Sequence, residues 1–189
     1  MRFINKLFTI FKLFLLKSKF RNIKLVATDI DGVLTDGGIF ISNNGEKIRK
    51  FNMKDGLGIK LLQSLGIEVA FISGGDGENI IERAQDLKVN NCLICVKNKK
   101  EALTKLQKAL NVKVFQTAYI GDDLNDIPVK DCTGLLISTA DASPGYKKFS
   151  DFILKSAGGS GAFREFADIL IDSKKGLLYL KKDGWIEKN

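Results

Sequence analysis

The feature that most constrains this 189-residue chain is an alternation of strand-like and helix-like patterns that begins at Lys24. Strand patterns cover residues 24–30, 67–73, 91–96, 116–123 and 134–138, and helix patterns cover residues 55–66, 78–88, 99–111 and 124–131. Strands separated by helices of this length form parallel sheets covered by helices on both faces. We therefore predict an α/β domain with a mostly parallel sheet, with residues 134–138 as its last core strand.

Residues 38–52 depart from this alternation. Two short apolar runs flank Asn43-Asn44-Gly45, and residues of this type form tight turns between antiparallel strands. The pattern predicts a small β-hairpin inserted after the first strand.

Polar residues follow the predicted strands at their carboxyl ends, where the sites of parallel sheets gather. They are Asp29 and Asp31 after the first strand, Ser73 after the second, Lys99 at the start of the next helix, and Asp122, Asp123 and Asp126 after the fourth. We expect these groups to converge on one small volume.

The chemistry open to such a cluster is limited because the chain has no histidine. This absence excludes Ser-His-Asp triads and His-ligated zinc, so acid–base work falls to carboxylates or lysines. The three cysteines, Cys92, Cys95 and Cys132, indicate a reducing cytosol, and Cys92 and Cys95, a C-x-x-C in an apolar run, are expected to be ordinary buried thiols. Clustered carboxylates repel one another, and oxygen ligands favour a hard cation such as Mg²⁺ together with a substrate phosphate. Of two neighbouring aspartates, one can attack phosphorus while the other protonates the leaving oxygen.

The segments "DIDGVLTDG", "FISGG", Lys99 and "GDDLND", in this order, resemble the four motifs of the haloacid dehalogenase-like phosphohydrolases. The resemblance spans Lys24 to about Leu170 and implies a Rossmann-like fold. It further implies that Asp29 is the nucleophile and Asp31 the general acid/base. Mg²⁺ would be held by Asp29, Asp122 and the Asp31 backbone carbonyl, with Asp123 and Asp126 beside these ligands. The phosphoryl group would be bound by Ser73, Gly74 and Lys99. Lys97 and Lys100 are the alternatives to Lys99.

Residues 35–67 and 74–99 leave no room for the cap domain of larger family members. The chain is similar to the capless sugar-phosphate phosphatases, such as the 3-deoxy-D-manno-octulosonate 8-phosphate and nonulosonate 9-phosphate phosphatases. This similarity implies Mg²⁺-dependent hydrolysis of a phosphorylated 2-keto-3-deoxy sugar acid by a cytoplasmic homotetramer whose hairpins meet at the centre. Gly75 departs from the T-G-R of the octulosonate enzymes, which predicts the loss of a charged group near the site.

Three further residues are candidates for substrate binding. Lys54 and Asp55, in "MKDG", either line the site or cap the following helix. Arg164, in "AGGSGAFREF", either binds a substrate carboxylate or pairs with Glu165 or Asp168.

The charge of the chain is uneven. Residues 1–24 carry seven Lys or Arg and no acid, and the whole chain has a formal net charge of +8. The main domain, residues 23–173, is therefore nearly neutral, which argues against nucleic-acid binding. Residues 1–22 have the pattern of a basic amphipathic helix, which either contacts a membrane surface through residues 1–20 or packs on the protein. Residues 174–189 form a C-terminal tail.

A protein of another class, a non-enzymatic phosphoacceptor or a membrane-surface protein, is the main alternative. In phosphoacceptor receiver domains the acceptor aspartate follows the third strand, whereas here the aspartate pair follows the first. The sequence therefore favours the enzyme.

Overall fold

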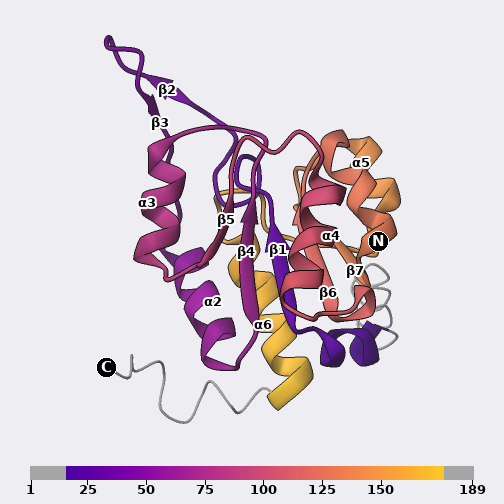
Figure 1. The fold of residues 1–189 in the computed structure, drawn as a ribbon. Helices are drawn as coiled ribbons and strands as arrows, with labels where there is room; N and C mark the ends of the chain where they lie inside the picture. The colour runs from indigo at the N-terminus through magenta and orange to yellow at the C-terminus, as the bar shows by residue number, and fades with distance from the viewer. Residues whose placement is uncertain (1–15, 177–189) are drawn as a thin grey trace, which may run out of the picture.

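The computed structural model describes residues 16–176, and its centre is a six-stranded sheet in the order β5-β4-β1-β6-β7-β8 (Figure 1). The strands are β1 (Leu25–Thr28), β4 (Glu68–Ile72), β5 (Asn91–Leu93), β6 (Thr117–Gly121), β7 (Leu135–Ser138) and β8 (Phe152–Ile153). Every neighbouring pair is parallel. The prediction of a parallel α/β sheet is confirmed.

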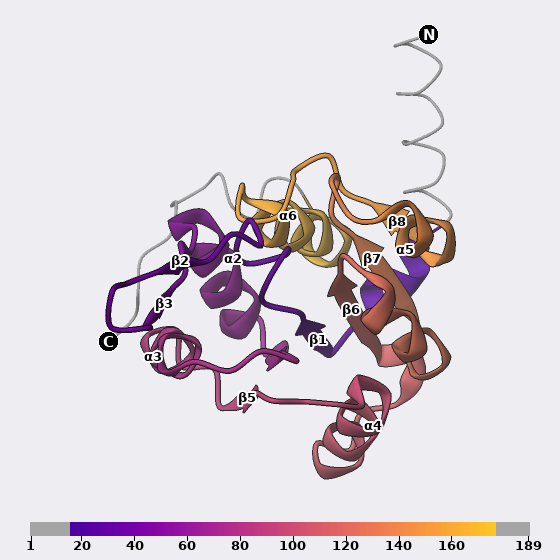
Figure 2. The ribbon, with the colours of Figure 1, turned by 90° about the horizontal axis from the view of Figure 1, so that it is seen from above.

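Helices cover both faces of this sheet (Figure 2). They are α2 (Met53–Ser64), α3 (Glu78–Asp86), α4 (Lys99–Ala109), α5 (Pro144–Phe149) and α6 (Ala162–Lys175), with the 3-10 helices η1 (Val114–Gln116) and η2 (Leu124–Cys132). Successive strand residues point to opposite faces. Val26 of β1 therefore packs in a cluster with α2, α3 and α6, whereas Leu25 and Ala27 pack with α4, η2 and α5.

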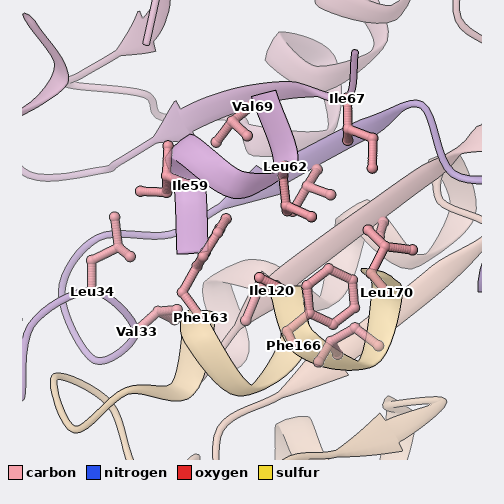
Figure 3. Close-up of a cluster of buried hydrophobic side chains, with 14 of the residues drawn as sticks. Val33, Leu34, Ile59, Leu62, Ile67, Val69, Ile120, Phe163, Phe166 and Leu170 are labelled. Carbon is pink, nitrogen blue, oxygen red and sulfur yellow. The ribbon is translucent and has the colours of Figure 1, made fainter. Parts of the chain in front are cut away.

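The larger core cluster holds the loop after β1 in place. Ile59 and Leu62 of α2 face Phe163, Phe166 and Leu170 of α6, and Val33 and Leu34 of the loop after β1 belong to the same cluster (Figure 3). Each such side chain, when fully buried, stabilises the fold by roughly 1.5–3 kcal/mol. The loop that carries the first two aspartates is thereby anchored on its apolar side.

The predicted hairpin forms and extends away from the body of the domain (Figure 1). Its strands, β2 (Phe40–Ile41) and β3 (Lys47–Ile48), pair antiparallel. Gly45 in the turn has a φ of 82°, a conformation that favours glycine. Within residues 29–52 only this hairpin and its connections lie between β1 and α2, so no cap domain is inserted there.

Four elements were not anticipated: η1, α5, β8 and α6. The strand at residues 134–138 is not the last one, because β8 pairs parallel with β7 at the edge of the sheet. A strand of two residues is too short to show an alternation of apolar and polar side chains. Helix α6 does have apolar residues at helical spacing, but no helix was predicted there.

The expectation that Cys92 and Cys95 are buried is wrong for Cys95 and only partly correct for Cys92. Cys132 is buried, but Cys92 is half-buried and Cys95 is exposed. The reason is that β5 ends at Leu93, so Cys95 lies in the connection after the strand rather than in the core.

The predicted N-terminal helix lies mostly outside the described residues. Residues 16–22 are helical. Phe20 is fully buried, with its ring centroid 6.4 Å from that of Phe152 and 6.1 Å from that of Phe166, so this end packs on the domain. Residues 177–189, most of the predicted tail, also lie outside the described part. Within residues 16–176 no helix is both long and apolar enough to cross a membrane.

Candidate active site

The carboxyl ends of the three central strands open into one pocket of about 470 Å³. Because β1 lies between β4 and β6, the loops that follow these strands meet at one edge. The lining residues are Asp29, Asp31, Ser73, Gly74, Gly75, Asp122, Asp123, Leu124 and Asn125. Most of the sequence-predicted acidic residues are thus brought together.

Asp29 is the most buried of the carboxylates that line the pocket. Its backbone N–H donates to the Ile120 carbonyl at 2.9 Å, which continues the β1–β6 ladder by one residue. Its Oδ1 accepts from the Ile30 N–H at 2.7 Å, and its Oδ2 lies 2.7 Å from the Lys99 Nζ. Both oxygens are therefore oriented by fixed donors while the residue borders the pocket.

Lys99 lies between two carboxylates. It is the first residue of α4, where the Asn98 side chain caps the helix, and its Nζ is 2.7 Å from both Asp29 Oδ2 and Asp126 Oδ1. Burial by itself lowers the pKa of Lys99, but Asp29 and Asp126 outweigh burial and raise that pKa above its usual value. Lys99 is therefore a cation at neutral pH. The alternatives lie elsewhere: Lys97 is exposed, and Lys100 pairs with Asp131.

Tyr119 is a residue that sequence reasoning missed. Its hydroxyl donates to Asp126 Oδ1 at 2.7 Å, and the Asp122 backbone N–H donates to Asp126 Oδ2 at 3.1 Å. Asp126 is fully buried. Its Oδ1 accepts from the Lys99 ammonium and its Oδ2 from the Asp122 N–H, so it fixes both Lys99 and the start of the β6–η2 loop. In the sequence Tyr119 is only one of the apolar residues of a buried strand.

Three carboxylates lie close together, and two of them, Asp29 and Asp122, border the pocket, whereas both Asp126 oxygens already accept hydrogen bonds. Asp29, Asp122 and Asp126 each offer an oxygen, and these oxygens lie within 4.8 Å of one another. A Cβ on Gly32 would lie 2.0 Å from Asp122 Oδ2, so the close approach of the two loops requires this glycine, which has a φ of 86°. The donors are all oxygen, which suits Mg²⁺.

The electrostatics of this cluster also favour a cation. Burial, and then repulsion from Asp126, raise the pKa of Asp29 to about 7, with Lys99 acting in the opposite direction. Burial, and then repulsion from Asp29 and Asp126, raise the pKa of Asp122 to about 7. A divalent ion would offset the repulsion and favour the ionised forms.

We expect the metal-free protein to lose thermal stability as the pH rises from about 4 to 7. The folded-state pKa values of Asp29 and Asp122 lie above the ordinary value of 3.8, so the folded state binds more protons than the unfolded state in this window. Mg²⁺ at about 100 times its dissociation constant adds about 2.7 kcal/mol. For a chain of this size that shift raises the melting temperature by roughly 5–10 °C. Because protons compete with the ion, the rise should be smaller at pH 5 than at pH 8.

Melting curves in EDTA and in Mg²⁺ at pH 5 and pH 8 measure this effect. The Asp122→Asn variant is the matched control, since it removes one ligand charge and should suppress the response. An equal Mg²⁺ shift at both pH values would contradict the prediction.

Asp31 is held by a guanidinium that the sequence did not point to. Arg49, which directly follows β3, donates from Nε to Asp31 Oδ1 at 2.8 Å and from Nη2 to Asp31 Oδ2 at 3.0 Å. The Thr35 hydroxyl donates to Asp31 Oδ1 at 3.1 Å. Because Gly75 stands where the octulosonate enzymes have an arginine, we expected no positive charge at this place. The Arg49 guanidinium nevertheless lies beside Gly75. In the sequence Arg49 lies between Lys47 and Lys50, and nothing distinguishes it from these neighbouring cations.

Ser73 and Asp123 border the same pocket. Ser73 is buried, and its Oγ accepts from the Gly75 N–H at 3.0 Å, which shapes the loop after β4. Asp123 is exposed, and its side chain accepts from the Leu124 N–H at 2.8 Å as the cap of η2.

Lys54, Asp55 and Arg164 lie away from this pocket. Lys54 and Arg164 line a second pocket of about 430 Å³. Asp55 is buried, and its Oδ1 accepts from the Arg164 N–H at 2.8 Å, near the start of α6, while the Arg164 Nε pairs with Asp168 at 2.8 Å. The helix cap of α2 is Asn52. A role of these three residues in substrate binding stays a prediction.

The comparisons with known proteins place this geometry in a family. The model of the haloacid dehalogenase-like hydrolases matches residues 96–165. A 3-deoxy-D-manno-octulosonate 8-phosphate phosphatase from Haemophilus influenzae is 41% identical over 141 residues, which are 75% of this chain and 78% of the relative. The chain belongs to the haloacid dehalogenase-like hydrolases. This membership confirms the resemblance seen in the motifs.

Solved structures of other haloacid dehalogenase-like hydrolases are also similar to this one. The 3-deoxy-D-manno-octulosonate 8-phosphate phosphatase from Yersinia pestis is 35% identical with a TM-score of 0.84, over 87% of this chain and 89% of that one. The enzyme of the same name from Moraxella catarrhalis, solved with a magnesium ion, a phosphate ion and a KDO molecule, is 33% identical with a TM-score of 0.82. That match covers 84% of this chain and 91% of the other.

Proposed function

We propose that this haloacid dehalogenase-like hydrolase is a Mg²⁺-dependent phosphomonoesterase that hydrolyses 3-deoxy-D-manno-octulosonate 8-phosphate. The observation that carries the proposal is the Asp29 carboxylate, which borders an open pocket and is oriented by the Ile30 N–H and by Lys99. The similarity to phosphatases named for this substrate supports the choice of sugar.

The residues account for a two-step reaction. An Asp29 oxygen attacks phosphorus, the bond from phosphorus to the sugar oxygen breaks, and Asp31, which enters this step as the protonated carboxylic acid, gives its proton to that oxygen and becomes a carboxylate. A water molecule then attacks the aspartyl-phosphate, Asp31 takes its proton, and phosphate leaves with Asp29 restored. Lys99 and Ser73 would bind the phosphoryl oxygens, and a Mg²⁺ ion held by Asp29 and Asp122 would neutralise charge that develops on them.

A nonulosonate 9-phosphate is the second candidate substrate. Gly75 lines the pocket where the octulosonate enzymes have an arginine, so this wall of the pocket carries a different group. Changes in one contacting group can shift the preference between related substrates by one or two orders of magnitude.

Phosphate release from both sugar phosphates, measured in Mg²⁺ and in EDTA, tests the proposal. We expect the highest kcat/KM with octulosonate 8-phosphate and no turnover in EDTA. A higher kcat/KM with the nonulosonate would transfer the assignment to that substrate. Stable phosphorylation of the protein without turnover would contradict an enzymatic role.

We also propose that the protein is a homotetramer joined through its hairpins. Phe40 and Ile41 of β2 and Ile48 of β3 are more than half exposed, and they lie on a hairpin that extends away from the body of the domain (Figure 1). Such a hairpin is marginal alone and gains stability when its apolar residues are covered. The double substitution Phe40→Asp/Ile41→Asp should yield monomers or dimers by light scattering. An unchanged tetramer, or a monomeric unmodified protein, would contradict this assembly.

A cytoplasmic location with membrane contact through residues 1–20 also stays a prediction. Co-sedimentation of the full chain with anionic liposomes, compared with a chain that begins at Arg21, tests the membrane contact. Equal binding by both chains would contradict it.

A further inference from the structure

The Arg49 side chain is the most enclosed cation of the hairpin. It is only 2% exposed, although it belongs to an element whose tip lies in solvent. Its Nε and Nη2 contact the two oxygens of Asp31, and its Nη1 donates to Asn79 Oδ1 at 3.0 Å. A two-point contact between guanidinium and carboxylate fixes the orientation of both planes.

Two glycines in the loop after β4 leave the space that this guanidinium fills. A Cβ on Gly75 would lie 3.1 Å from Arg49 Nη2 and 3.3 Å from Asp31 Oδ2. A Cβ on Gly77 would lie 2.6 Å from Arg49 Nη1. Side chains at these positions would displace Arg49 from Asp31.

The β3 strand of the hairpin is also tied to the same loop and to the first turn of α3. The Asn79 side-chain amide donates to the Lys47 carbonyl at 2.7 Å, and the Lys47 Nζ pairs with Asp76 at 2.8 Å. These contacts and the Arg49–Asn79 bond hold the hairpin, the loop after β4 and the loop after β1 in one arrangement.

We propose that Arg49 is a positioning residue that aims the Asp31 carboxyl at the leaving oxygen, so that the orientation of the catalytic acid depends on the hairpin. This inference rests on the proposed function of Asp31. Without the guanidinium, the remaining side-chain contact of Asp31 given by the structure is the Thr35 hydroxyl on Oδ1, which leaves the carboxyl free to turn. A proton donor that is misdirected in this way loses most of its catalytic effect.

The test compares leaving groups. Arg49→Met should lower kcat/KM for the sugar phosphate by roughly 30–100-fold, which is less than the roughly 10²–10⁴-fold that general acid catalysis contributes because the acid is misdirected but still present. It should lower kcat/KM for p-nitrophenyl phosphate by less than about fivefold, because p-nitrophenolate departs without a proton. Arg49→Lys should lie between, since an ammonium cannot contact both oxygens in one plane. Lys50→Met is the matched control: Lys50 is a neighbouring exposed cation that pairs with Asp36.

A double-mutant cycle with Asp31→Asn separates positioning from a general structural effect. Asp31→Asn should show the same dependence on leaving group, and Asp31→Asn/Arg49→Met should be no slower than Asp31→Asn by more than about twofold. Should Arg49→Met fail to fold, as judged by circular dichroism, Gly75→Ala should give the same leaving-group pattern on a smaller scale.

Three results would overturn the inference: equal losses for both leaving groups, a rise in KM with kcat unchanged, or additive effects of the two substitutions. A rise in KM alone would make Arg49 a substrate-binding residue. If the unmodified protein hydrolysed neither phosphate ester, the proposed function itself would fail. If the unmodified protein turned over and Arg49→Met had the same activity, only the role of Arg49 would be rejected.

Discussion

The Asp29→Asn variant should release phosphate at least about 10⁴-fold more slowly than the unmodified protein, because an amide cannot attack phosphorus. The effect should fall on the chemical step and leave the fold intact, because Asp126 still pairs with Lys99. Asparagine has nearly the same shape, and its carbonyl oxygen can still accept from the Ile30 N–H. Steady-state phosphate release and trapping of the phosphorylated protein measure the loss.

The control for this experiment is Asp131→Asn. Asp131 is an exposed carboxylate that pairs with Lys100, away from the pocket, so its neutralisation should leave turnover unchanged. Circular dichroism of both variants checks the fold. Turnover by Asp29→Asn close to that of the unmodified protein would rule out Asp29 as the nucleophile.

Lys99→Met should impair both activity and stability. The substitution leaves Asp29 and Asp126 buried with no Lys99 ammonium between them, and removal of one partner from a buried ion pair costs about 3–5 kcal/mol. It also removes a positive charge beside the attacking oxygen, which we expect to lower kcat by roughly 10²–10³-fold. Urea unfolding in EDTA gives the first quantity, and steady-state kinetics in Mg²⁺ gives the second.

Lys100→Met provides the comparison for Lys99→Met. Lys100 is the next residue of α4, but its side chain is 45% exposed and pairs at the surface, where an ion pair contributes at most about 1 kcal/mol. We expect that variant to be nearly as stable and as active as the unmodified protein. Equal losses in the free energy of unfolding for the two lysine variants would show that the buried ion pairs of Lys99 stabilise the fold no more than the surface pair of Lys100.

Much of the fold could be predicted from the sequence because it depends on periodicity. The strand patterns near residues 24–30, 67–73 and 116–123 contain β1, β4 and β6, which lie side by side in the sheet. Because parallel sheets gather sites at the carboxyl ends of their strands, Asp29, Ser73 and Asp122 could be assigned to one pocket. Short or irregular elements such as β8 have no comparable period and were missed.

The chain order of residues therefore determined which strands form the sheet, which carboxylates share its edge, and which chemistry is open to a protein without histidine. The tertiary structure alone decided which groups hold those carboxylates: Tyr119 on Asp126, Arg49 on Asp31, and Arg164 on Asp55 at a distance from the pocket. The physical reason is that strand and helix periods depend on near neighbours. The partner of a polar side chain, in contrast, depends on which distant loops meet, and on where a glycine such as Gly32 or Gly75 leaves them room.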